Sequence, residues 1–89
     1  MIRLDVTIRN RLGLHARAAA RFVHVASRYR SRITVTRDGR SMDGKSILGI
    51  LLLAASQGVC LELAADGEDE GPALEALAAL VNQGFGEEG

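Results

Sequence analysis

The sequence predicts an α+β domain. It is expected to be a two-layer, open-faced sandwich in which three helices cover one face of a four-stranded, mostly antiparallel sheet. Two observations predict this class. Some segments alternate apolar and polar residues, as half-buried strands do, and others repeat apolar residues at helical spacing. These segments follow one another in the order β-α-β-β-α-β-α. The 89 residues contain no linker or internal repeat, so we expect a single domain over residues 1–89.

Local turn and cap signals separate the elements. Asp38-Gly39 predicts a hairpin turn, and Gln57-Gly58 is expected to end the second helix. Pro72 suits the first turn of the third helix, because a proline lacks the N–H that this turn leaves unbonded. The expected strands occupy residues 2–9, 32–37, 40–42 and 59–65, and the expected helices occupy residues 16–29, 47–56 and 72–81.

The second helix differs from the others because it is apolar nearly all round. Ser46 stands immediately before it, where an N-cap is expected. We expect Ile50 and Leu53 to be buried, while another side of this helix stays exposed. Further along the chain, the acidic residues 66–70 are expected to form a solvated turn, and residues 86–89 a frayed tail.

Composition and cysteine content favour a cytoplasmic location. Cys60 is the only cysteine, so no disulfide can form within the chain, and a reducing compartment is expected. Charges at Arg3 and Asp5 are incompatible with an apolar secretory segment at this end. The longest apolar run, residues 47–55, is far shorter than the roughly 20 residues that span a bilayer. We therefore expect no membrane anchor.

The formal net charge is zero, but the two halves of the chain differ in sign. All 11 Lys and Arg residues lie within residues 1–45, with three of the 11 acidic residues. Residues 46–89 hold the other eight acidic residues and no Lys or Arg. A basic half suggests an anionic ligand or an acidic protein surface as its partner. The alternative is that folding interleaves the halves and removes the imbalance.

His15 is the candidate reactive residue. It lies between a loop that contains Gly13 and the start of the first helix. A helix start offers unbonded N–H groups and a partial positive charge, which together bind anions. This potential disfavours an imidazolium, and the neutral imidazole is the nucleophilic form. Arg17 adds a cation for phosphate oxygens. The alternative interpretation is that His15 is a helix cap or an ordinary surface residue.

The segment Gly13-Leu14-His15-Ala16-Arg17 resembles the phosphohistidine motif of the HPr family, the histidine phosphocarriers of bacterial phosphotransferase systems. Phe22-Val23 follows in register, and residues 44–49 resemble the regulatory-serine region of the family. The resemblance extends over about residues 2–85. It departs at Ala18, where most relatives have proline, and this departure is similar to the nitrogen-related or regulatory branch. Alanine is an excellent helix former, so we expect the site to survive.

The resemblance implies a relay of phosphoryl transfers. Phosphoenolpyruvate phosphorylates enzyme I, enzyme I passes the group to Nδ1 of His15, and His15 passes it to an enzyme IIA-type protein. The backbone N–H groups of Ala16 and Arg17 would hold the phosphoryl oxygens, and the Arg17 side chain would add charge. The family implies a monomeric carrier, a transferase component rather than a turnover enzyme by itself, with no cofactor and no metal ion.

The resemblance also assigns a regulatory site and a docking surface. Ser46 resembles the serine that HPr kinase/phosphorylase phosphorylates, and its role as a cap is compatible with this. A phosphate there would add roughly −1.5 to −2 charges beside the docking surface. The residues implied to contact partners are Leu12, Ala16, Ala20, Arg21, His24, Ile47, Leu48 and Leu51.

Two other functions remain open at this stage. One is a regulatory relative that docks to proteins and acts mainly through Ser46. The other is a small basic module that binds nucleic acid. The chain has only Phe22, Tyr29 and Phe85 as aromatic residues, and none is expected on a strand where bases could stack. We therefore expect no nucleic-acid partner.

Overall fold

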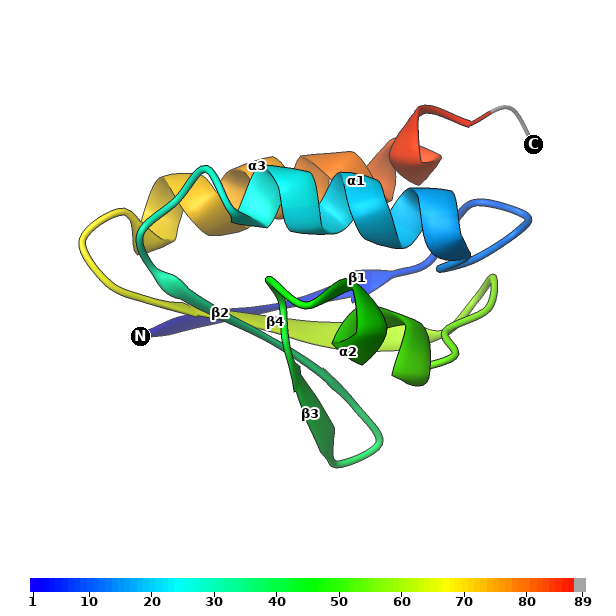
Figure 1. Cartoon of the computed structure of the whole chain (residues 1–89), viewed down its shortest axis with the longest axis horizontal. Coiled ribbons are helices and arrows are strands. Elements are labelled where there is room, and N and C mark those ends of the chain that lie inside the picture. The colour runs from blue at the N-terminus through cyan, green and yellow to red at the C-terminus, as the bar shows by residue number, and fades with distance from the viewer. Residues whose placement is uncertain (88–89) are drawn as a thin grey trace.

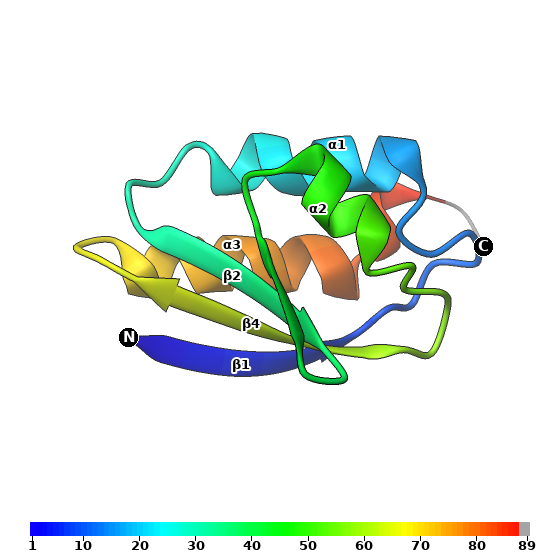
Figure 2. The same cartoon turned by 60° about the horizontal axis from the view of Figure 1, so that its bottom comes forward.

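The computed structural model describes residues 1–87, and it confirms the predicted fold class. The elements are β1 (Ile2–Thr7), α1 (Ala16–Ala26), β2 (Arg32–Arg37), β3 (Arg40–Asp43), α2 (Ile47–Leu52), β4 (Cys60–Asp66), α3 (Glu70–Asn82) and a 3-10 turn (Gly84–Gly86). The strands form one antiparallel sheet in the order β1-β4-β2-β3. Figure 1 shows α1 and α3 side by side along one face of this sheet, and Figure 2 shows the shorter α2 beside α1.

An apolar core holds the helices on the sheet. Alternate residues of the two central strands point toward the helices, and Ile33, Val35 and Leu63 of these strands are at most 1% exposed. Phe22 of α1 and Phe85 of the C-terminal turn reach the same core. Burying a side chain of this size contributes about 1.5–3 kcal/mol. Within residues 1–87, no helix combines the length and the apolar character that crossing a bilayer requires.

Three local predictions are confirmed. Asp38 and Gly39 both have positive φ, 48° and 81°, as a tight hairpin turn between β2 and β3 requires. Ser46 is the N-cap of α2, and its Oγ accepts the N–H of Gly49 at 3.0 Å. Ile50 and Leu53 are buried, as expected for the core side of this helix.

The predicted end of the second helix is wrong, because α2 ends at Leu52 rather than at residue 56. The chain turns at Ala54, whose φ is 49°. The guanidinium of Arg37 donates to the carbonyls of Leu53 and Ala54 at 2.9 and 2.8 Å. A side chain from the sheet therefore satisfies these carbonyls, so another helical turn would add few hydrogen bonds.

The first helix is also shorter than predicted and ends at Ala26 rather than at residue 29. The N–H groups of Arg28 and Tyr29 bond three residues back, to the carbonyls of Val25 and Ala26. Bonds of this span tighten the last turn of a helix into 3-10 geometry.

The acidic segment at residues 66–70 does more than form a solvated turn, because Asp69 joins two loops. Its carboxylate accepts the N–H groups of Arg30 and Ser31, each at 2.9 Å, and also the hydroxyl of the buried Ser31. The Ser31 hydroxyl and the Arg30 N–H together lower the pKa of Asp69 to about 2. Asp69 thereby fixes the start of α3 against the segment that leads into β2.

We predict that Asp69 makes the free energy of unfolding depend on pH in acid. The folded-state pKa of about 2 lies below the ordinary aspartate value of 3.8, so the unfolded chain binds the proton first. The stabilisation from Asp69 is therefore complete above that value and is lost as the pH falls toward 2. Urea unfolding should show Asp69→Asn less stable than the unmodified chain at pH 7, with the difference shrinking between pH 5 and pH 2. A difference independent of pH would contradict this assignment.

Candidate functional site

His15 is the N-cap of α1, and its side chain bonds the helix that it precedes. Its carbonyl accepts the N–H of Ala19 at 2.9 Å, which begins the helical hydrogen bonds. Its ring atom Nδ1 accepts the N–H of Arg17 at 3.3 Å. A helix cap and a reactive group at a helix start, the two interpretations left open by the sequence, are thus compatible in one residue.

The loop before His15 is fixed on both sides. Asn10 is 2% exposed, and its Nδ2 donates to the carbonyl of Gly13 at 2.8 Å. The N–H of Leu14 donates to the carbonyl of Ala55 at 2.8 Å, which joins the loop to the chain after α2. Gly13 has a φ of 68° and lies so close to Ala55 that a Cβ at this position would be 2.6 Å from its carbonyl oxygen. Glycine is therefore required here both for its backbone conformation and for the close approach.

Glu87 contacts His15, a feature that the sequence analysis missed. One carboxylate oxygen of Glu87 meets Nε2 of the ring, and the other accepts Nδ2 of Asn10 at 2.9 Å. The predicted fraying is therefore wrong for Gly86 and Glu87, and residues 88–89 lie outside the described part of the chain. Glu87 follows His15 by 72 residues, and nothing in the local sequence marks it as a partner.

The two ring nitrogens have different partners. Nδ1 accepts a backbone N–H, so it holds no proton, and Nε2 is left as the donor to the Glu87 carboxylate. The hydrogen bond from Asn10 lowers the pKa of Glu87, burial raises it, and the His15 contact lowers it again, so that the pKa lies below its ordinary value. In the neutral ring, this arrangement leaves the lone pair on Nδ1, which faces the N–H of Arg17 at the helix start.

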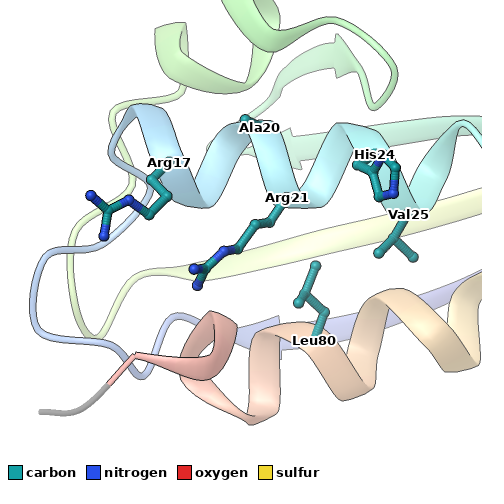
Figure 3. Close-up of a pocket in the computed structure, with 6 residues that line it drawn as sticks. All are labelled: Arg17, Ala20, Arg21, His24, Val25 and Leu80. Atoms are coloured by element: carbon teal, nitrogen blue, oxygen red, sulfur yellow. The ribbon is translucent and has the colours of Figure 1, made fainter.

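Arg17 and Arg21 both extend from α1 (Figure 3), but they differ in their contacts. Arg21 extends toward the C-terminal turn, where its guanidinium donates to the carbonyl of Phe85. Arg17 is exposed near the start of α1, and its guanidinium has no hydrogen bond or ion pair within residues 1–87. Arg17 is therefore available to an anion bound beside His15, whereas Arg21 is already engaged.

The residues implied to contact partners are accessible on the helix side of the domain. Leu12, Ile47 and Leu48 are 69%, 44% and 68% exposed, which is high for large apolar side chains. A groove of about 440 Å³ also runs between α1 and α3, with Leu80 on its α3 side (Figure 3). Of the remaining implied residues, Leu51 is half-buried and the others are exposed, namely Ala16, Ala20, Arg21 and His24.

Ser46 begins a second helix that packs against the first. It is half-buried, and its hydroxyl is occupied in capping α2. Its neighbour Lys45 donates from Nζ to the carbonyl of Tyr29 at 2.6 Å, which ties the approach to α2 to the end of α1. Across residues 1–87, no group of three or more His, Cys, Asp or Glu side chains is placed to hold a metal ion.

An imidazole at the start of a helix, on an open-faced α+β sandwich of this topology, defines the class of small histidine phosphocarrier domains. The family model described as "PTS HPr component phosphorylation site" matches residues 2–83. The phosphocarrier protein HPr of Pseudomonas aeruginosa is 52% identical over 85 residues, covering 94% of each chain. The HPr-like protein Crh of Bacillus subtilis is 45% identical over 83 residues, covering 93% of this chain and 98% of Crh.

Structural comparison gives the same result. The crystal structure of HPr-C-His from Thermoanaerobacter tengcongensis matches with a TM-score of 0.95 at 45% identity, covering 99% of each chain. The chain therefore belongs to the HPr family of phosphocarriers.

We predict that Gly13→Ala destabilises the domain more than the same change at another glycine with positive φ. The added Cβ would meet Ala55 and Ser56 at under 3 Å. We therefore expect the free energy of unfolding to fall by about 2–4 kcal/mol, from backbone strain and overpacking together. Gly39→Ala is the matched control, because a Cβ there meets nothing within 4 Å and only the strain, about 1–2 kcal/mol, applies. Urea unfolding measures the free energy of unfolding of both variants. Equal decreases would contradict the prediction, because they would show that the loop around Gly13 moves to make room for the Cβ.

Proposed function

We propose that His15 accepts a phosphoryl group on Nδ1 from phosphorylated enzyme I and then passes it to an enzyme IIA-type protein. The observation that supports this most directly is the N–H of Arg17, which points at Nδ1 from 3.3 Å at the start of α1. A group bonded to Nδ1 would meet this N–H and the positive end of the helix. Membership of the HPr family supports the same assignment.

The transfer needs position and charge more than it needs further reactive groups. The Nδ1 lone pair forms a bond to phosphorus while the P–N bond to the histidine of enzyme I breaks, and that electron pair returns to the donor nitrogen. The N–H groups of Ala16 and Arg17 lie in the first turn of α1 and would bind the phosphoryl oxygens. The Arg17 guanidinium, which is exposed and unengaged by residues 1–87, would neutralise their charge.

The docking surface would fit a partner whose own contact surface has an apolar centre surrounded by acidic residues. Ile47 and Leu48 present exposed apolar side chains on α2, and Arg17, Arg21 and His24 line the neighbouring helix. Apolar contact would supply affinity, and the basic residues would orient the partner and speed its approach. Since enzyme I and the acceptor each need access to His15, we infer that both use this surface in turn.

We also propose regulation at Ser46. Phosphorylation there would place negative charge at the start of α2, beside Ile47. The helix start tolerates an anion, so the domain would remain folded, but an acidic partner would be repelled from the docking surface. HPr kinase/phosphorylase is the class of enzyme that the family implies for this step.

A regulatory role through Ser46 alone is the second candidate, and it is favoured by the 45% identity to Crh, which is described as the Bacillus subtilis catabolite repression HPr. The presence of His15 together with Arg17 favours the carrier. Nucleic-acid binding gains no support, because Phe22 and Phe85 are each 1% exposed and Tyr29 packs against the core. Two of the three aromatic rings are buried and the third is partly buried, so they form no exposed platform for stacking bases.

We predict that incubation with enzyme I and phosphoenolpyruvate adds one acid-labile phosphate, and that His15→Ala abolishes this label. Arg17→Ala should slow transfer about 100-fold, as expected when a group that stabilises developing charge is removed. Rapid-quench measurement of labelled protein gives these rates. Arg3→Ala, on the exposed edge strand, is the matched arginine control and should behave as the unmodified chain does. A folded His15→Ala protein that still takes up phosphate would exclude His15 as the acceptor.

We predict that two substitutions at Ser46 separate its structural role from its regulatory one. Ser46→Ala should lower the free energy of unfolding by about 1 kcal/mol, because the cap to Gly49 is lost, while transfer continues. Ser46→Asp keeps a capping oxygen and should remain close to the original stability, yet phosphorylation by enzyme I should slow because of the added charge. Unfolding curves and transfer rates measure the two effects. If Ser46→Asp transfers phosphate at the unmodified rate, charge at this position does not regulate docking.

A further inference from the structure

We propose that Glu87 is a positioning residue of the phosphoryl-transfer site, which holds the ring proton of His15 on Nε2 and so leaves Nδ1 as the attacking nitrogen. This inference rests on the proposed function of His15. The Glu87 carboxylate meets Nε2, while the N–H of Arg17 meets Nδ1. The two contacts lie on opposite nitrogens of one ring, and each is compatible with only one tautomer.

The carboxylate is held by more than its contact with His15. Its second oxygen accepts Nδ2 of Asn10 at 2.9 Å, and the same nitrogen donates to the carbonyl of Gly13 at 2.8 Å. The side chains of Glu87 and His15 are 14% and 28% exposed, so water has limited access to the pair. A shielded carboxylate with fixed partners on both oxygens can set the orientation of an imidazole.

The backbone before Glu87 is anchored in the domain. Phe85 is 1% exposed and keeps a φ of 58°, a conformation that a bulky residue adopts only when its surroundings impose it. Its carbonyl accepts the guanidinium of Arg21, which Figure 3 shows reaching from α1 toward this turn. The N–H of Glu87 donates to the carbonyl of Gly84 at 3.0 Å. A folded turn therefore delivers the carboxylate to the ring.

The charge of Glu87 matches the charge that transfer creates. When Nδ1 bonds to phosphorus and Nε2 keeps its proton, the ring becomes positively charged, and the adjacent carboxylate neutralises it. When the phosphoryl group leaves, the electron pair of the P–N bond returns to Nδ1, and the ring departs as neutral imidazole. Without the Nε2 proton, the leaving group would be an imidazolate, which is a much poorer one. Holding this proton therefore favours both acceptance and donation.

The test combines a rate with a measurement of the tautomer in the full chain. In ¹⁵N NMR spectra of the ring, the unmodified protein should show the neutral His15 as the Nε2–H form. Glu87→Ala leaves only the 3.3 Å contact from the Arg17 N–H to select the tautomer. It should therefore shift the ring toward a mixture of both tautomers and slow phosphorylation by phosphorylated enzyme I about 10-fold or more. Glu87→Asp should recover part of both effects. Glu75→Gln, an exposed glutamate on α3, is the matched control and should change neither.

The outcomes separate this inference from the function on which it rests. If the unmodified chain takes no phosphate on His15, the proposed function fails. If it does take phosphate and Glu87→Ala reacts within about twofold of its rate, only the role of Glu87 is overturned. A slower Glu87→Ala protein whose ring spectrum is unchanged would also overturn it, because the glutamate would then act on docking and not on the ring.

Discussion

The N–H of Arg17 points at Nδ1 of His15, and the chemistry available to the ring depends on this contact. The contact exists because His15 ends the loop in an extended conformation and α1 begins with the next residue. The Arg17 amide, which donates to the ring in the free protein, would donate instead to a group bonded to Nδ1. Phosphorylation would therefore exchange one acceptor for another at the same amide, with no rearrangement of the helix. Ala18, where the family resemblance leads us to expect a proline, is fully buried in this turn, and α1 includes it without a break.

The features that could be predicted from the sequence are those that residues close together in the chain determine. The sheet, the helices, the hairpin at Asp38-Gly39 and the cap at Ser46 follow from alternation, helical spacing and turn chemistry, each of which acts within a few residues. His15 and Arg17 could be found in the same way, because the motif that contains them is contiguous. Features made by distant segments were missed. Arg37 of β2 binds the carbonyls that follow α2, Asp69 bonds Ser31 across 38 residues, and Glu87 meets His15 across 72.

Folding relieves only part of the charge imbalance between the two halves of the chain. Arg3 lies 3.9 Å from Glu62, and the N-terminal amine lies 3.3 Å from Glu70, so some opposite charges meet on the sheet side. Arg17, Arg21 and His24 remain exposed along α1. Both interpretations of the charge pattern are therefore partly correct. Arg17 and Arg21 are among the basic residues that have no ion pair within residues 1–87, and both lie on the helix that begins at His15, where an anionic group and an acidic partner would approach.

The packing of the C-terminal turn determines where foreign sequence is tolerated. Figures 1 and 2 place Met1 at one end of the domain, whereas the turn at Gly84–Gly86 lies beside the loop that leads to His15. A segment fused after Glu87 would therefore start next to the imidazole of His15. An affinity tag or a fused domain at that end would crowd the His15 ring and place its own charges beside it. A fusion at Met1 would be separated from it by the length of the sheet.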